Sequence, residues 1–139
     1  MKAYISIKYH ADNRNRECIE AIAAALEERG YQTVCIVRDV EDWGRAQLSP
    51  EALMARSFEE IDSSDLVVVD LTEKGVGLGI EAGYAHARGI PVVTIARQGA
   101  DISQTLRGIS AQVLWYEGRD DLKRVVEKIG NRGIGLRKE

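Results

Sequence analysis

One stretch decides the fold, and it reads Asp65-Leu-Val-Val-Val-Asp-Leu-Thr72, Glu73-Lys-Gly-Val-Gly-Leu-Gly79, Ile80-Glu-Ala-Gly-Tyr-Ala-His-Ala-Arg-Gly89. Its first part is a continuous apolar run of strand length with an acid near its end, a pattern typical of a strand buried on both faces of a parallel sheet. Its last part has helical spacing and stops at Gly89, a suitable residue just beyond a helix. The stretch therefore predicts a strand, a glycine-rich loop and a helix.

The glycines Gly75, Gly77 and Gly79 leave the loop backbone bare, so a ligand can approach main-chain N–H groups where the helix begins. We place Glu81 in the first helical turn, where the dipole favours negative charge, and expect an ionised carboxylate that can act as a nucleophile. A structural reading is the alternative. Acids are common in first turns, and glycines after a strand often form only a tight turn.

The composition indicates a soluble globular protein, because 45% of its 139 residues are hydrophobic and 29% are charged. We expect one domain over residues 1–130 and a loose, glycine-rich tail over 131–139. The net charge of -3 argues against a nucleic-acid polymer as partner. No apolar run approaches the roughly 18 residues that span a membrane, so we expect a cytoplasmic protein without membrane contact.

The cysteines Cys18 and Cys35 have no spacing typical of a metal site or a disulfide framework. His10 and His86 are the only histidines available to support such a site. We therefore expect neither a metal nor a cofactor.

Strands and helices alternate along the whole chain. Strands are predicted over 3–7, 32–37, 65–72, 91–96 and 112–116, and helices over 16–29, 50–63, 79–88, 103–109 and 120–129. This order predicts a doubly wound, five-stranded parallel sheet of the flavodoxin or Rossmann-like type, with strand order 2-1-3-4-5. Such sheets bind ligands where the order reverses, here between the first and third strands.

The loop after the first strand is basic and polar, and it faces the glycine-rich loop at this reversal point. Its candidate ligands for an anionic group are Lys8, His10, Asn13 and Arg14, with Arg16 beside them. The alternative is a solvated surface turn, because single lysines and arginines are usually exposed.

The segment from Gly75 to Ala85 resembles the glycine turn and glutamate of the nucleoside 2-deoxyribosyltransferase superfamily, which includes the 2′-deoxynucleoside 5′-phosphate N-hydrolases. The strand at 64–72 and the segment at 103–108 are also similar to this superfamily, and the resemblance covers most of the chain. It implies a small nucleoside or nucleotide as substrate, and a homodimer or higher homo-oligomer.

The resemblance implies that Glu81 attacks C1′ of the sugar and releases the base, leaving a glycosyl-enzyme that water or a second base resolves. Tyr4 would hold this carboxylate, although it could equally be a half-buried strand tyrosine. Asp70 would position substrate or water. Ser103 would contact an anionic substrate group across a dimer interface, or alternatively only cap the helix after it.

Among the departures from the pattern of the superfamily, two concern candidate site residues. Ser57 stands where many relatives have an acid in the helix before the third strand, and Gly75 replaces a polar or acidic residue. We place both among the substrate-binding candidates, together with Gly77 and Gly79. Glu59 and Glu60 are near Ser57 in sequence but point elsewhere on a helix.

The basic loop and Ser103 suit a phosphate, so hydrolysis is favoured over base transfer. Trp43, in the long segment 38–48, is predicted to stack on the base or to cover the site, with packing at a subunit contact as the alternative.

Three other functions stay open. The segment from Gly77 to Ala82 fits the dinucleotide pattern GxGxxA, although it does not follow the first strand. Residues 3–12 resemble the first box of TIR domains, which are signalling or NAD-cleaving modules. The departures at Ser57 and Gly75 favour a non-catalytic nucleotide-binding domain.

Overall fold

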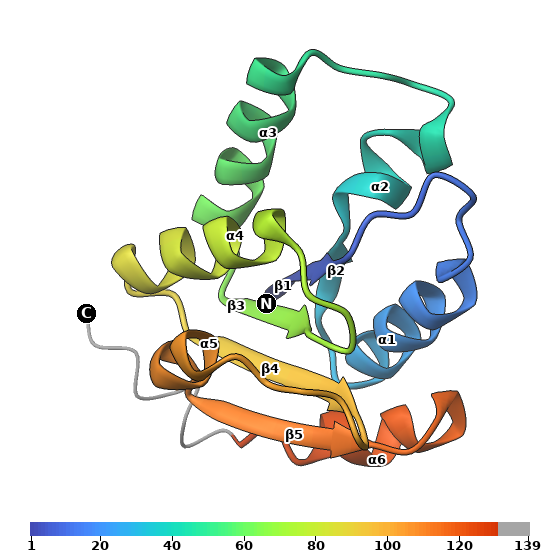
Figure 1. Cartoon of the computed structure of the whole chain (residues 1–139), viewed down its shortest axis with the longest axis vertical. Coiled ribbons are helices and arrows are strands. Elements are labelled where there is room, and N and C mark those ends of the chain that lie inside the picture. Colours follow the sequence, from blue (N-terminus) through green and yellow to red (C-terminus); the bar gives the residue numbers. More distant parts are fainter. Residues whose placement is uncertain (131–139) are drawn as a thin grey trace.

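The fold is a five-stranded parallel sheet with helices on both faces, seen in a computed structural model that describes residues 1–130 (Figure 1). The predicted tail at 131–139 lies outside the described residues. The strands are β1 (Lys2–Ile7), β2 (Gln32–Val34), β3 (Leu66–Asp70), β4 (Val92–Arg97) and β5 (Gln112–Tyr116). Their order is β2-β1-β3-β4-β5, so the predicted doubly wound fold and its reversal between β1 and β3 are confirmed.

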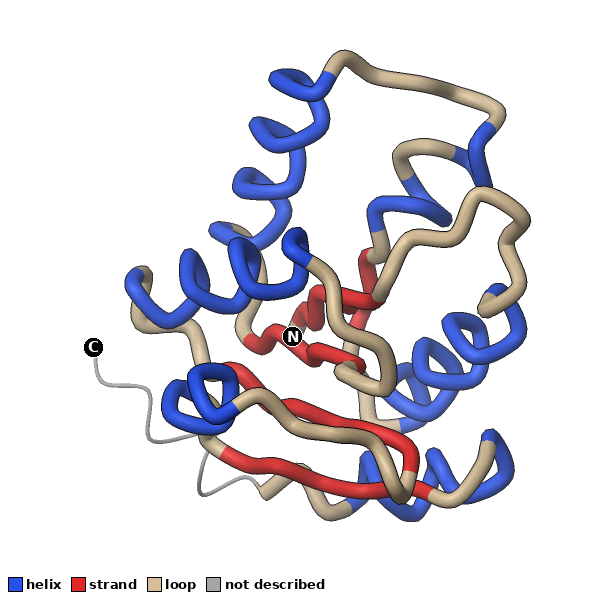
Figure 2. The backbone as a smooth tube through the Cα atoms, viewed as in Figure 1, coloured by secondary structure: helices blue, strands red, loops and turns tan. Residues whose placement is uncertain are grey.

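Two layers of helices enclose the sheet, and Figure 2 shows them on either side of the strands. The helices are α1 (Arg16–Glu28), α2 (Ile36–Asp39), α3 (Pro50–Asp62), α4 (Val76–Ala87), α5 (Gln104–Ile109) and α6 (Leu122–Glu127), with single 3₁₀ turns η1 (Asp42–Gly44) and η2 (Arg119–Asp121). Helices α1 and α6 pack on one face and α3, α4 and α5 on the other. Among residues 1–130, no helix combines the length and the apolar character needed to cross a membrane.

Alternation along the central strands creates two separate cores. Ile5 and Val68 point toward α1 and α6, whereas Tyr4 and Val67 point toward α3 and α4. These four side chains are at most 2% exposed, because helices cover both faces of the sheet. The even-numbered positions of β1 therefore share the face that carries α4.

Local capping fixes the start of α3 and the end of α4. The hydroxyl of Ser49 accepts a hydrogen bond from the Ala52 N–H at 3.1 Å, and Pro50 is the first residue of α3. Gly89 follows α4 with φ of 75°, a left-handed conformation that glycine adopts without steric cost.

The second strand is shorter than predicted, because β2 ends at Val34 and residues 36–39 form α2. The Asp39 carboxylate accepts from the Cys35 N–H at 2.9 Å, and the Asp39 N–H donates to the Cys35 carbonyl at 2.8 Å. This local bonding turns the chain into a helix in spite of its apolar strand-like sequence. The segment 38–48, predicted as one loop, thus contains the end of α2 and all of η1.

Helix α4 begins three residues before the predicted start at Gly79. Its N-cap is Gly75, in an extended conformation, and its first residue is Val76. Gly77 and Gly79 therefore lie within the helix and not in the loop before it. The segment that fits GxGxxA is then not a strand-to-helix turn of the dinucleotide-binding type.

Candidate active site

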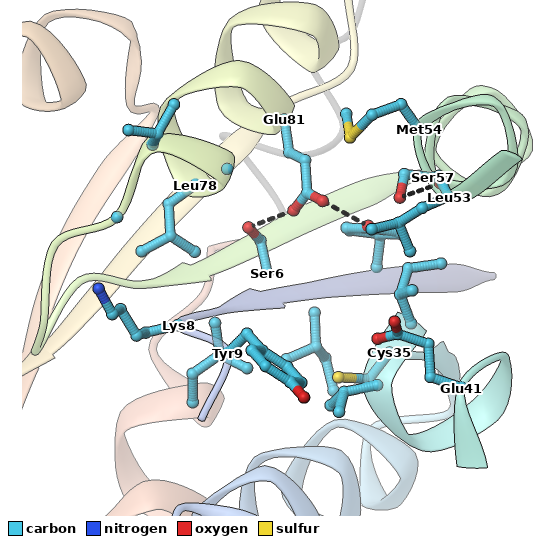
Figure 3. Close-up of a pocket in the computed structure, with 18 of the residues that line it drawn as sticks. Ser6, Lys8, Tyr9, Cys35, Glu41, Leu53, Met54, Ser57, Leu78 and Glu81 are labelled. Carbon is cyan, nitrogen blue, oxygen red and sulfur yellow. Dashed lines mark hydrogen bonds between the residues drawn. The ribbon is translucent and has the colours of Figure 1, made fainter. Parts of the chain in front are cut away.

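A cavity of about 520 Å³ opens where the strand order reverses, between β1, α3, α4 and the segment from Cys35 to Leu48 (Figure 3). The polar side chains that line it are Tyr4, Ser6, Lys8, Tyr9, Glu41, Gln47, Ser57 and Glu81. Apolar side chains complete its wall, with Leu53 and Met54 from α3 and Leu78 from α4. A mostly apolar hollow with a few convergent polar groups is the usual form of a small-molecule site.

Two hydroxyl groups of β1 hold the carboxylate of Glu81. The Ser6 hydroxyl donates to Oε1 at 2.6 Å, and the Tyr4 hydroxyl donates to Oε2 at 3.0 Å. Figure 3 shows the Glu81 side chain descending from α4 toward Ser6. Tyr4 and Ser6 are two residues apart on one face of β1, so both can reach a group placed by α4.

Burial has the largest effect on the pKa of this carboxylate. Enclosure in the cavity wall raises the pKa of Glu81, and the hydrogen bonds from Ser6 and Tyr4 oppose that rise. Glu81 lies in the second turn of α4, and the first turn holds no acid. The predicted first-turn location was wrong, and the predicted dipole stabilisation is replaced by two side-chain donors.

Tyr4 is a permanently protonated donor in this setting. Burial raises the pKa of its phenol, and the neighbouring charge of Glu81 raises it further. The phenol therefore cannot compete with Glu81 for the negative charge. Its hydroxyl makes the hydrogen bond to this carboxylate that the resemblance implied.

Lys8 lies at the rim of the cavity beside the start of α4. A β-carbon built at Gly75 would come within 3.3 Å of Lys8 Cδ, so the glycine leaves room for the lysine side chain. Within residues 1–130, the Lys8 ammonium takes part in no hydrogen bond or ion pair. It is available to a ligand at the N-terminus of a twelve-residue helix.

Ser57 and two of the three predicted glycines also line the cavity. The Ser57 side chain is buried, and its hydroxyl donates to the Leu53 carbonyl one turn earlier in α3, at 2.9 Å. Gly75 and Gly77 are part of the wall, whereas Gly79 is exposed and not part of it.

Four predicted ligands, His10, Asn13, Arg14 and Ser103, lie outside the cavity. His10 pairs with Glu73, Arg14 is exposed and pairs with Asp12, and the Ser103 hydroxyl bonds to its neighbour Thr105 at 2.8 Å. Grouping His10 and Arg14 with Lys8 was wrong for this cavity, because the chain turns away after Tyr9 and its polar groups bond to one another.

Asn13 and Trp43 form a separate contact behind the cavity wall. The Asn13 amide donates to the Trp43 carbonyl at 2.9 Å, and the Arg16 guanidinium lies 4.4 Å above the centre of the Trp43 ring. The Trp43 side chain packs against the core under α1 and does not line the cavity. The predicted stacking of Trp43 on a base is therefore not the arrangement seen.

Asp70 is buried on the side of the sheet away from Glu81 and does not line the cavity. Its carboxylate accepts hydrogen bonds from the Tyr116 hydroxyl and from the Thr72 N–H at 2.8 Å. The sequence predicted a role in positioning substrate or water. The contacts instead tie the end of β3 to the end of β5.

Replacing Asp70 by asparagine tests this structural role. An amide has one acceptor oxygen, so one of the two donors loses its partner, and we expect the free energy of unfolding to fall by about 1–3 kcal/mol. Urea unfolding measures that loss, and we expect kcat to be unchanged. A large fall in kcat without a change in stability would restore the catalytic assignment.

Sequence reasoning missed four polar residues that line the cavity: Ser6, Tyr9, Glu41 and Gln47. Ser6 carried a signal, because it is two residues from Tyr4 on the same strand and so shares its face. Glu41 carried none, since the segment 38–48 that contains it was predicted as a loop. Among residues 1–130, no group of three or more potential metal ligands is arranged to hold a metal ion.

The fold and site define a doubly wound α/β enzyme with a carboxylate at the reversal point of its sheet. Residues 4–131 match the nucleoside 2-deoxyribosyltransferase family, and the chain belongs to this family. The resemblance found in the sequence is confirmed. Enzymes of this kind cleave the N-glycosidic bond of nucleosides or transfer the sugar of the nucleoside.

Individual relatives agree with this assignment. The chain is 26% identical over 133 residues to an inferred 2′-deoxynucleoside 5′-phosphate N-hydrolase 1 of Thermofilum pendens, covering 93% of this chain and 92% of that protein. It is 30% identical over 105 residues to a protein of the same name from Syntrophotalea carbinolica, covering 73% and 72%. A 2-deoxyribosyltransferase of Bacillus psychrosaccharolyticus has the same fold, with a TM-score of 0.68 at 15% identity over 88% of this chain and 90% of that one.

Proposed function

We propose that the protein hydrolyses the N-glycosidic bond of a 2′-deoxynucleoside 5′-monophosphate and that Glu81 is its nucleophile. The observation that carries the proposal is the Glu81 carboxylate on the cavity wall, with both oxygens held by hydroxyl donors from β1. The names of the two relatives point to the same substrate class.

The reaction has two displacement steps. In the first, a Glu81 oxygen bonds to C1′ while the C1′–N bond breaks, and the electron pair of that bond leaves with the base, which takes up a proton. In the second, water adds to C1′, the bond from C1′ to Glu81 breaks, and the water releases a proton. Splitting one hard displacement into two easier ones is the logic of retaining glycosidases.

The hydroxyls of Ser6 and Tyr4 hold the carboxylate in place before the reaction. A nucleophile that is already oriented needs little rearrangement to reach the transition state. Their hydrogen bonds also stabilise the ionised form, which is the reactive one. The same donors stabilise the carboxylate when it leaves C1′ in the second step.

The assay that tests the function measures free base by liquid chromatography after incubation with each of the four deoxynucleoside monophosphates. Base release without an added acceptor base supports hydrolysis. Release that requires an acceptor would show transfer. No base above a Glu81→Ala control would favour the non-catalytic nucleotide-binding alternative, and nicotinamide release from NAD would favour the TIR-like one.

Lys8 and the N-terminus of α4 are proposed to hold the 5′-phosphate. Both provide positive potential at one rim of the cavity, and phosphate binds well to a lysine and to helix N–H groups together. Lys8→Ala is expected to raise KM for the monophosphate about tenfold to a hundredfold, which corresponds to about 1.4–2.7 kcal/mol. KM for the nucleoside without phosphate should not change.

Lys74 provides the matched control for this variant. It lies in the loop just before α4, and its ammonium pairs with Asp101 at 2.7 Å outside the cavity. Lys74→Ala should leave both KM values unchanged. Equal effects of Lys8→Ala on the monophosphate and the nucleoside would contradict a phosphate role.

Ser103 can reach a bound phosphate only if a second copy of the chain brings it there. In the single chain it is partly buried at the start of α5, outside the cavity. Its role across a homodimer interface stays a prediction. Ser103→Ala would raise KM for the monophosphate if that interface forms.

A further inference from the structure

The departing base needs a proton that Glu81 cannot supply. The base leaves with the electron pair of the C1′–N bond and departs far more readily if an acid protonates it. Glu81 is bonded to C1′ at that moment and cannot be the donor. A second acid is therefore needed on the cavity wall.

Most hydroxyl and thiol groups of the cavity are unsuited to this role. The Ser57 hydroxyl is committed to the Leu53 carbonyl, and Tyr4 is committed to Glu81. Burial raises the pKa of the Cys35 thiol to about 12, so it is a very weak acid at neutral pH. These groups can shape the cavity but cannot readily supply a proton.

Glu41 stands on the wall opposite Glu81, and Figure 3 shows its carboxylate turned toward the interior of the cavity. The side chain is half-buried. Within residues 1–130, its carboxylate takes part in no hydrogen bond or ion pair. The carboxylate oxygens remain accessible to solvent, so they are available to a ligand that enters the cavity.

The backbone holds Glu41 in a fixed position. Its N–H donates to the Ile36 carbonyl, and its carbonyl accepts from the N–H groups of Gly44 and Ala46, all at 2.9 Å. The residue thus connects α2 with η1 through three main-chain hydrogen bonds. It is presented to the cavity by a bonded turn and not by a free loop.

The two residues after Glu41 have unfavourable backbone conformations. Asp42 has φ of 47° and Trp43 has φ of 58°, each costing on the order of 1–3 kcal/mol for a residue other than glycine. Contacts of the Trp43 carbonyl with Asn13 and of its ring with Arg16 hold this turn in place. The fold maintains strain at the point where the chain presents Glu41.

We infer that Glu41 is the general acid of the proposed reaction, an inference that rests on the proposed function. In the first step its carboxyl proton moves to a ring nitrogen of the base as the C1′–N bond breaks. In the second step the resulting carboxylate takes the proton of the attacking water. Each turnover therefore returns Glu41 to its protonated form, and atoms and charges balance.

The distribution of charge in the cavity agrees with this division of roles. The other titratable side chains that face the cavity are Tyr4, Lys8, Tyr9, Cys35 and Glu81. Burial raises the pKa of Glu41, and none of these groups donates a hydrogen bond to its carboxylate. At Glu81 two hydroxyl donors stabilise the ionised form and oppose the effect of burial, whereas no donor does so at Glu41.

The experiment compares two substrates with Glu41→Gln. The monophosphate of deoxyguanosine needs a proton on its departing base, whereas the 7-methyl derivative already carries a positive charge and needs none. We expect kcat of the variant to fall about 10²- to 10³-fold on the first substrate and less than about threefold on the second. The fall in activity of the wild-type enzyme at alkaline pH should disappear in the variant.

Asp42→Asn is the matched control, because Asp42 is the adjacent acid, is exposed and does not line the cavity. It should leave both rates unchanged, and melting temperatures show whether each variant is folded. Equal losses on the two substrates, or no loss on either, would overturn the role of Glu41 while the proposed function stands. If the wild-type enzyme releases base from neither substrate, the proposed function and this inference fall together.

Discussion

Glu81→Gln is expected to abolish base release, with kcat falling by at least about 10³-fold. Glutamine has nearly the same shape and can still accept a hydrogen bond from Ser6 or Tyr4, but its amide is not a nucleophile. The other groups of the cavity remain, so substrate should still bind. Single-turnover kinetics with each deoxynucleoside monophosphate would measure the loss, and calorimetry would measure the affinity.

Glu59→Gln is the matched control, because Glu59 is exposed on α3 and does not line the cavity. It should behave as the wild-type enzyme does. A Glu81→Gln variant that keeps a tenth or more of the wild-type kcat would show that another group attacks C1′. Acid-quenched wild-type enzyme should carry deoxyribose phosphate on the peptide that contains Glu81, which mass spectrometry can detect.

The same variant should be more stable than the wild-type protein at alkaline pH. Burial raises the pKa of Glu81 in the folded state above its value in the unfolded chain. The folded protein therefore binds this proton more tightly, and its stability falls as the pH rises through the raised pKa. Glutamine does not ionise, so the variant should melt at a higher temperature at pH 8, with the difference vanishing near pH 4.

Removing both donors to Glu81 should produce the second-largest loss. A hydrogen bond to a charged group contributes about 1.5–3 kcal/mol, so Tyr4→Phe and Ser6→Ala should each lower kcat/KM about 10- to 100-fold. The double variant should lose about 10²- to 10³-fold, less than the product, because both donors act on one carboxylate. Steady-state kinetics of the single and double variants measure this coupling.

The pH dependence distinguishes this role from simple packing. Without a donor the Glu81 carboxylate is less well stabilised, so its pKa rises further. The acidic limb of the kcat/KM profile should move to higher pH in both single variants. Tyr84→Phe provides the control, because the Tyr84 hydroxyl bonds to Asp62 outside the cavity at 2.8 Å. An unmoved acidic limb in Tyr4→Phe would mean that the phenol does not act on the carboxylate.

The fold could be predicted from sequence because its signals are local and repeated. Apolar runs of strand length alternate with helices of regular spacing, and the Ser49-Pro50 cap and Gly89 mark helix ends. The failures lie where a few hydrogen bonds override such patterns. Residues 36–39 have the composition of a strand, but the bonds between Asp39 and Cys35 form a helix.

The candidate site could be predicted only in part, for a related reason. Glu81 and Tyr4 lie on regular elements and Lys8 directly follows one, so their position followed from the order of the strands. His10 and Arg14 lie in a loop, where pairing with nearby acids decides the direction of each side chain. Glu41 depends on a turn with unusual backbone angles, which no periodic pattern indicates.

The spacing of side chains on β1 fixes the distance between groups that are proposed to act on the substrate. Tyr4 and Ser6 are two residues apart on β1, about 6.6 Å along a parallel strand, and Lys8 follows Ile7, the last residue of that strand. The two donors that hold the proposed nucleophile are thus separated by a fixed repeat of the backbone, and the lysine proposed for the phosphate comes directly after them. Deleting Ile5 would turn one of the two donors to the opposite face of the sheet, so this strand tolerates substitution far better than any change in length.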